Sequence, residues 1–210
     1  MYIPAHFHEK DLARLDWLAA HDAFGTLVSQ VDGAPFATHL PVIYRREESR
    51  VTLWGHWARP NPQWQNIEGQ RVLFMFHGPH TYVSPRWYVE PKRQVPTWNY
   101  ATAHLYGRIT LEHDPAVIAR HVAALADKYE QGASEPWRLA DSHPGNVRSL
   151  GGVVGFELAV DEIQVKYKLN QNHPVRNREG VVRALSQSPS QDGKAIASLM
   201  AEALAQRPKT

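Results

Sequence analysis

The residues best suited to chemistry in this sequence are histidines, an arginine and amides that recur in or beside predicted strands. Such side chains donate hydrogen bonds to a phosphate or to the polar edge of a ring. Each histidine taken alone is better explained as a structural residue whose hydrogen bonds are satisfied. Together, however, they supply the donors that a phosphorylated ligand with a polar ring needs. The set comprises His39, His56, His104, Arg59, Asn61 and Asn99.

Large aromatic side chains concentrate between Gly78 and Glu112. From Thr97 onward, small or apolar residues alternate with bulky polar ones, which predicts a strand with one core face. The other face carries Trp98, Tyr100 and Tyr106, and these rings have polar ends. Such a face fits the floor of a ligand site or a subunit interface. A half-buried strand with amphipathic side chains remains the alternative.

A second unusual segment covers residues 166–176, with the sequence KYKLNQNHPVR. Lys166 and Lys168 share one face of a predicted strand, and three amide residues follow just before a predicted helix. Those amides either cap the helix or hydrogen-bond the edge of a heterocycle, and both interpretations stay open.

Several kinds of site lack their usual motifs. The sequence has no cysteine and no G-x-G-x-x-G, phosphate-loop, G-x-S-x-G or H-E-x-x-H pattern. Disulfides, thiolate catalysis and cysteine-ligated metals are therefore excluded. His77 and His80 would need two further metal ligands, and Gly78-Pro79 predicts a turn between them, so no metal site is predicted. No acid, base or nucleophile stands out, so enzymatic activity stays open.

Composition indicates an ordinary globular protein of 210 residues, with 21% charged and 43% hydrophobic residues. The formal net charge of +2 gives no electrostatic reason to expect nucleic-acid binding. The N-terminus lacks the apolar core of a signal peptide, and no apolar run has the length of a membrane span. We therefore expect a soluble, cytoplasmic protein.

The hydrophobic pattern predicts a mainly β protein with flanking helices, built as a barrel of six or seven mostly antiparallel strands. Asp32-Gly33 is a hairpin signal between two of the strands. Asp114-Pro115 is a helix start. Strands are predicted at 23–31, 35–44, 50–57, 72–77, 97–112 and 152–169. Helices are predicted at 8–21, from about Pro62 to Gly69, from Pro115 to Gly132, at 175–186 and at 192–204, with residues 133–151 rich in loops.

Long composite motifs reveal a resemblance to a known family. They are MYIPAHF at the start, GHWARPNPQW at 55–64, GPHTYVSPRWY at 78–88, VPTWNYATAHLYG at 95–107 and KYKLNQN at 166–172. The sequence resembles the PaiB-like FMN-binding proteins, known as negative transcriptional regulators. These belong to the flavin split-barrel superfamily, as do the pyridoxamine-phosphate oxidases. In the family motifs, Trp57 and Pro60 are intrusions here, and Asn170 and His173 replace a serine and an arginine.

The resemblance implies a split β-barrel of about six antiparallel strands over residues 1–172 and a helical extension over 173–210. The extension would pack on the barrel or on a partner subunit. The expected homodimer binds one FMN at each of two sites between subunits. The expected contacts fall into four groups. The isoalloxazine would be flanked by Thr38, His39, Leu40 and Pro41, and its ring would also be lined by Trp98 and Asn99. The phosphate or ribityl chain would be approached by His56, Ala58, Arg59 and Asn61, and the partner subunit would contribute its own Lys168, Gln171 and Asn172.

The function implied is that of an FMN-binding protein with a redox or flavin-sensing role, which includes an FMN-dependent oxidoreductase. A DNA-binding repressor without redox turnover is an alternative. Against it, we find no helix-turn-helix, and the predicted helix at 175–186 carries only Arg176, Arg178 and Arg183 as basic residues. A haem-binding split barrel that uses one of the histidines is a further alternative.

Overall fold

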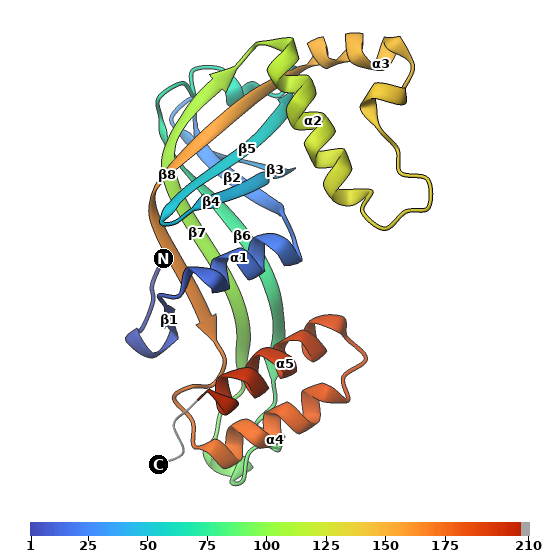
Figure 1. Ribbon diagram of the computed structural model, residues 1–210. Coiled ribbons are helices and arrows are strands. Elements are labelled where there is room, and N and C mark those ends of the chain that lie inside the picture. Colours follow the sequence, from blue (N-terminus) through green and yellow to red (C-terminus); the bar gives the residue numbers. More distant parts are fainter. Residues whose placement is uncertain (207–210) are drawn as a thin grey trace. The chain divides into compact units, whose positions relative to one another are not determined.

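The computed structural model describes residues 1–206, and Figure 1 labels its helices and strands. The strands are β1 (His8–Glu9), β2 (Phe24–Val31), β3 (Ala34–Pro41), β4 (Ile43–Glu47), β5 (Arg50–Ala58), β6 (Arg71–Val83), β7 (Thr97–Glu112) and β8 (Val153–Lys168). The helices are α1 (Leu12–His21), α2 (Pro115–Tyr129), α3 (Pro144–Ser149), α4 (Val175–Ser186) and α5 (Gln191–Ala205). Within residues 1–206, no helix is long and apolar enough to cross a membrane.

The strands form one sheet in the order β3-β2-β6-β7-β8-β5-β4, and β1 pairs with β8. The pairings β1–β8, β2–β3, β2–β6, β4–β5 and β5–β8 are antiparallel. Asp32 and Gly33 join β2 to β3 with φ angles of 50° and 78°, which suits the twist of a tight hairpin. The sheet ends at β3 and β4 without closing between them. This arrangement confirms the predicted split barrel with flanking helices, although the sheet has eight strands.

Two compact units divide the chain, and each of the long strands β6, β7 and β8 contributes residues to both. The first unit comprises Ala19–Phe76 and His104–Ile163, which include β2 to β5 and α2. The second unit comprises Met1–Leu18, His77–Ala103 and the chain from Gln164 onward, which includes α4 and α5. The predicted boundary between residues 172 and 173 stays a prediction.

The core of the β2–β5 unit lies on the inner face of its strands. Along β5, Val51, Leu53 and Trp57 are buried, whereas the alternate positions are half-buried, as the period of two predicts. Gly55 continues the buried row because the ring of Phe156 packs closely against it. A Cβ atom at this position would come within 2.6 Å of Phe156 Cζ. The side chains between these buried positions therefore face out of the barrel.

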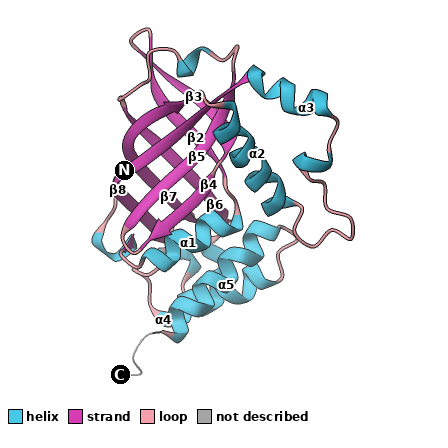
Figure 2. Cartoon of the chain, turned by 45° about the horizontal axis from the view of Figure 1, so that its top comes forward, coloured by secondary structure: helices cyan, strands magenta, loops and turns pink. Residues whose placement is uncertain are grey.

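Helix α2 lies beside this sheet, as Figures 1 and 2 show. Its start confirms the prediction, because the Asp114 carboxylate accepts a 2.8 Å hydrogen bond from the backbone N–H of Ala116. The helix is anchored by an apolar cluster of Ile118 with Leu139 and Leu150. The loop-rich segment that follows α2 thus holds the helix in place.

In the other unit, α4 and α5 pack side by side and follow the predicted ranges closely. Gly180 of α4 lies directly against the carbonyl oxygen of Trp87, so that a Cβ at this position would clash with the backbone. This close approach fixes α4 against the 3₁₀ turn Pro85–Trp87.

The structure corrects several predictions. The strand expected at 35–44 is two strands, β3 and β4, and the helix expected at 8–21 begins only at Leu12, after strand β1. The helix expected up to Gly69 is only a 3₁₀ turn, Pro62–Trp64, because Asn66 has a φ of 61° that a right-handed helix does not allow. The turn expected at Gly78-Pro79 is wrong, since β6 continues through both residues to Val83. The recorded pairing of β6 with β2 ends at Phe76, so the missing N–H of Pro79 falls beyond that ladder.

Candidate functional site

The end of β3 carries the first group of predicted contacts. Thr38 Oγ1 accepts a 3.0 Å hydrogen bond from Asn61 Nδ2, so the structure brings together one residue from each of two predicted groups. His39 is exposed, and Pro41 is half-buried at the end of the strand. Leu40 is only 3% exposed, so its side chain belongs to the core. The accessible surface at this end of β3 is therefore made by Thr38, His39 and Pro41.

Gln63 holds this group in place, although no pattern in the sequence singles it out. Its side chain is fully buried, and its Oε1 accepts a 3.0 Å hydrogen bond from Trp57 Nε1. Its Nε2 lies 3.1 Å from each of three acceptors, Leu27 O, Ser29 Oγ and Phe36 O. One side chain thus ties the turn after β5 to both strands of the β2–β3 hairpin.

The end of β5 carries the second group. Ala58 and Arg59 are exposed, and His56 is half-buried with a pKa that burial lowers. Arg59 donates from Nε to Gly151 O at 2.7 Å and from Nη2 to Val153 O at 3.0 Å. Two nitrogens of its guanidinium group are thus already bound to backbone carbonyls near the start of β8. Within the described residues, Nη1 is the guanidinium nitrogen without a recorded hydrogen bond.

The remaining predicted contacts lie in the other unit. Lys168 Nζ donates to Thr97 Oγ1 at 2.6 Å and to the Trp98 carbonyl at 2.5 Å. Burial, followed by the charge of the neighbouring Lys166, lowers the pKa of Lys168. The Trp98 ring is 53% exposed and lies edge-on to Tyr82, with 6.2 Å between ring centres. The structure therefore joins a cationic side chain to an exposed aromatic surface.

The amides of this unit have mainly structural contacts. Gln171 closes the end of β8, since its Oε1 accepts from Leu169 N at 2.7 Å and its Nε2 donates to Tyr167 O at 2.5 Å. Asn99 is fully buried, with its Nδ2 3.3 Å from Met200 Sδ, so it faces the core and not the surface. Asn172 is exposed.

Asn170 and His173, two of the residues that depart from the family motifs, form a cluster around Tyr88. Asn170 has a φ of 59°, a conformation that asparagine tolerates well, and its Nδ2 lies 2.6 Å from the Tyr88 hydroxyl. The His173 ring stacks on Tyr88 at 4.9 Å with an interplanar angle of 11°. Both replacements therefore fix the chain after β8.

Polar atoms without partners mark the outer side of β5. Trp54 Nε1, His56 Nδ1 and both ring nitrogens of His121 are buried and have no hydrogen-bond partner among the described residues. His121 comes from α2, and its ring meets Trp54 edge-on at 3.9 Å between centres. Burial lowers its pKa, so the ring is held neutral. A histidine on the otherwise apolar stripe of α2 was the sequence signal for this residue.

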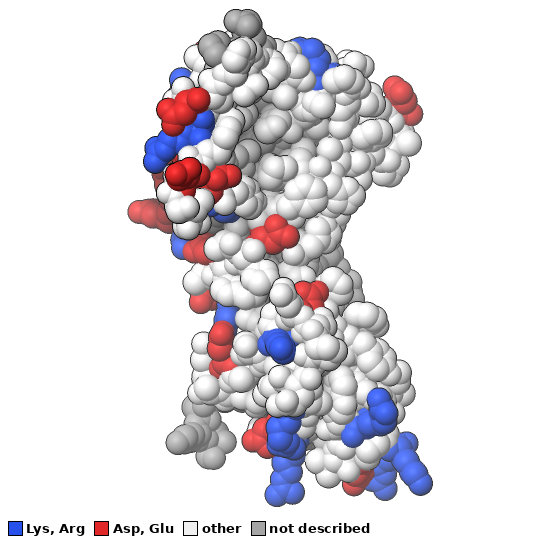
Figure 3. Space-filling view, turned by 90° about the vertical axis from the view of Figure 1, so that its right-hand side faces the viewer, with Lys and Arg blue, Asp and Glu red and all other residues white. Residues whose placement is uncertain are grey.

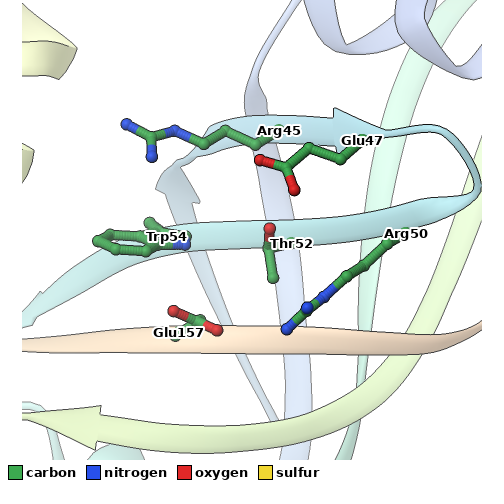
Figure 4. Close-up of a pocket in the computed structure, with 6 residues that line it drawn as sticks. All are labelled: Arg45, Glu47, Arg50, Thr52, Trp54 and Glu157. Atoms are coloured by element: carbon green, nitrogen blue, oxygen red, sulfur yellow. The ribbon is translucent and has the colours of Figure 1, made fainter.

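A pocket of about 210 Å³ opens on the same outer face. Figure 4 shows its lining, which comes from three adjacent strands. The guanidinium carbon of Arg45 lies 5.3 Å from the Trp54 ring centre, which is a cation–π contact. The lining residues are Arg45 and Glu47 of β4, Arg50, Thr52 and Trp54 of β5, and Glu157 of β8.

Sequence comparison relates this chain to a family of proteins. The family model described as “Putative FMN-binding domain” matches residues 1–162. The Bacillus subtilis protein named “Protease synthase and sporulation protein PAI 2” is 36% identical over 207 residues. That match covers 97% of this chain and 98% of the relative.

Solved structures share the fold. The flavocytochrome Anf3 from Azotobacter vinelandii matches with a TM-score of 0.58 and 17% identity, over 79% of this chain and 72% of that one. The FAD and haem binding protein from Mycobacterium smegmatis matches with a TM-score of 0.56 and 17% identity, over 77% of this chain and 73% of that one. At these identities the likeness concerns the fold alone.

Proposed function

This chain belongs to the PaiB-like family described as “Putative FMN-binding domain”, and we propose that it binds FMN in a redox or flavin-sensing role. The observation that carries the proposal is the pair of unpaired ring nitrogens on the outer face of β5, Trp54 Nε1 and His56 Nδ1. Buried polar atoms without a hydrogen-bond partner cost roughly 1–3 kcal/mol each; Trp54 Nε1 is a donor, and His56 Nδ1 can donate or accept. This face therefore fits a ligand rich in hydrogen-bond acceptors, as a flavin mononucleotide is.

The residues at the ends of β3 and β5 have distinct roles in this proposal. Thr38, His39 and Pro41 offer the surface beside the flavin ring, with Leu40 supporting them from the core. Arg59 offers Nη1 to the phosphate while its other nitrogens stay bound to the start of β8. Because those bonds hold the guanidinium in one place, little side-chain entropy is lost when the phosphate binds.

The predicted contacts in the unit that contains α4 and α5 act in a homodimer, which is also part of the proposal. Exposed Trp98 and Asn172 and half-buried Lys168 of the partner subunit would complete each flavin site. The support is the exposed aromatic surface beside a lysine whose position is already fixed by two hydrogen bonds. Bound FMN supplies either two-electron redox chemistry or a signal of flavin supply.

The visible absorption spectrum of the protein as purified tests the proposal. A flavin band, or its appearance with added FMN, is the expected result. Bleaching of that band by NADH or NADPH without oxygen supports a redox role, whereas a band that persists favours sensing. A colourless protein that does not perturb the spectrum of added FMN would refute flavin binding.

DNA binding is a second candidate because basic side chains gather on one part of the surface. Figure 3 shows Lys and Arg concentrated at the lower end of the view, where α4 lies in Figure 1. Arg178 of α4 is buried, so this helix presents only Arg176 and Arg183. A band shift that survives moderate salt and competitor DNA would establish this function; a shift that unrelated DNA abolishes as readily as the same sequence does would exclude sequence-specific binding. The exposed basic residues of this unit include Arg86, Lys92, Arg93, Arg176 and Arg183.

A further inference from the structure

His121 occupies a costly position in α2. Its ring is 7% exposed, and neither nitrogen has a hydrogen-bond partner among the described residues. Folded proteins pair the great majority of their buried polar atoms, so an unpaired imidazole lowers the stability of the ligand-free chain. Trp54 Nε1, on the ring that His121 meets at 3.9 Å, is unpaired as well. The buried polar atoms that lack a hydrogen-bond partner are thus concentrated where His121 meets Trp54.

The anchoring of α2 does not require a histidine here. Ile118 already holds the helix in an apolar cluster with Leu139 and Leu150. A phenylalanine at position 121 would offer the same flat ring to Trp54 without nitrogens to satisfy. The polar atoms of His121 therefore call for an explanation beyond packing.

A cavity of about 180 Å³ borders His121. Two carboxylates line it, those of Glu112 and Glu157, and it shares Trp54 and Glu157 with the pocket of Figure 4. Within residues 1–206, no group of three potential ligands could hold a metal ion, so metal binding does not explain the cluster. Its full lining is Trp54, Thr110, Leu111, Glu112, His121, Phe156 and Glu157.

We propose that His121 contacts the uncharged part of the bound flavin, and that this cavity receives its hydroxyl or N–H groups and excludes its phosphate. The proposal rests on the proposed FMN binding and assigns α2 a part in the site. A neutral imidazole donates from one nitrogen and accepts at the other, and Trp54 donates, which matches groups that both give and take hydrogen bonds. Glu112 and Glu157 accept hydrogen bonds from hydroxyl and N–H groups, but they repel a phosphate.

Burial supports this assignment because it lowers the pKa of His121 and keeps the ring neutral. Of the charges that act on the ring, Glu112 raises the pKa, whereas Arg120, Arg45 and His56 lower it. A neutral ring offers no attraction to a phosphate dianion. Arg59, which has a guanidinium nitrogen to spare, remains the phosphate contact in this arrangement.

The decisive variant is His121→Phe, which keeps a flat ring against Trp54 and removes both nitrogens. The ligand-free variant should melt at the same temperature as the wild type or higher, because unpaired polar atoms are gone. Its affinities for FMN and for riboflavin should fall by the same factor, roughly three- to tenfold for each hydrogen bond lost. His121→Gln, which keeps a donor and an acceptor, should retain more affinity for both flavins.

His113→Phe is the matched control, since His113 is exposed just before α2. It should leave both affinities unchanged. The inference is refuted if His121→Phe binds both flavins like the wild type, or if it loses affinity for FMN alone. A wild-type protein that binds neither flavin refutes the proposed function instead. If His121→Phe does not fold, His121→Gln decides by the same comparison: a fall in affinity for FMN alone refutes the inference.

Discussion

Replacement of Gln63 by methionine is the sharpest test of how the site is held together. Methionine has nearly the same length and volume but can neither donate nor accept these hydrogen bonds. The change leaves the buried Trp57 Nε1 without an acceptor and removes the donor shared by Leu27 O, Ser29 Oγ and Phe36 O.

The expected loss of unfolding free energy in Gln63→Met follows from the hydrogen bonds that Gln63 makes. The Gln63 oxygen accepts one hydrogen bond here, and the two hydrogens of its amide nitrogen are shared among three acceptors, so the observed contacts amount to three full hydrogen bonds at most. Each buried group left unpaired costs roughly 1–3 kcal/mol, and relaxation recovers part of this. We expect the free energy of unfolding to fall by about 3–5 kcal/mol. Urea unfolding of the ligand-free protein, with an unchanged m value, measures it.

Gln65→Met is the control, because Gln65 is exposed one residue after the same turn. Its unfolding free energy should stay within about 0.5 kcal/mol of the wild type, as for most surface changes. A loss below about 1 kcal/mol for Gln63→Met would show that the hydrogen bonds to the β2–β3 hairpin are not what holds this turn.

Three further predictions concern the flavin, protons and the backbone. Arg59→Ala should weaken the binding of FMN by roughly 1.5–3 kcal/mol and should change the binding of riboflavin little. An equal loss of affinity in titrations with both flavins would show that Arg59 does not contact the phosphate. Burial lowers the pKa of His56 and His121, so the unfolded state binds more protons below pH of about 6.5. The unfolding free energy should therefore fall as pH drops from about 6.5 toward the folded-state pKa values, by up to about 1.4 kcal/mol per unit for each histidine. If His121 contributes to this pH dependence, the unfolding free energy of His121→Phe, measured in urea, should change less with pH than that of the wild type. An identical slope for the two proteins would contradict this assignment. Asn170→Ala should lower the melting temperature more than Asn170→Gly, because both lose the bond to Tyr88 but alanine also costs about 1–2 kcal/mol at a φ of 59°; the reverse order would refute this.

Local patterns predicted much of the fold. The alternation along 97–112, the Asp32-Gly33 turn and the Asp114-Pro115 helix start depend on residues close in sequence, and the structure confirms all three. Strand β6 was predicted too short because Pro79 normally ends a ladder. Pro79 is tolerated because it lies beyond the ladder with β2, which ends at Phe76, and β6 also has β7 as a neighbour in the sheet; no local pattern reveals this.

The candidate site depended on contacts between distant residues. The family resemblance named Thr38 and Asn61 as separate contacts, and the hydrogen bond between them is known only from the structure. The guanidinium of Arg59 hydrogen-bonds backbone carbonyls some ninety residues later in the chain, and the residues beside Arg59 in the sequence do not predict this. His121 was visible as a polar residue on an apolar stripe, but its meeting with Trp54 depends on how α2 packs.

Equilibrium titration of the purified protein with FMN tests the central claim most directly. We expect saturable quenching of flavin fluorescence that reaches its end point at one FMN per chain. Replacing both Trp54 and His56 by phenylalanine, which removes the unpaired ring nitrogens of β5, should weaken this binding without loss of the fold. Fluorescence that changes only in proportion to added protein, without saturation, would contradict the claim that this chain holds FMN.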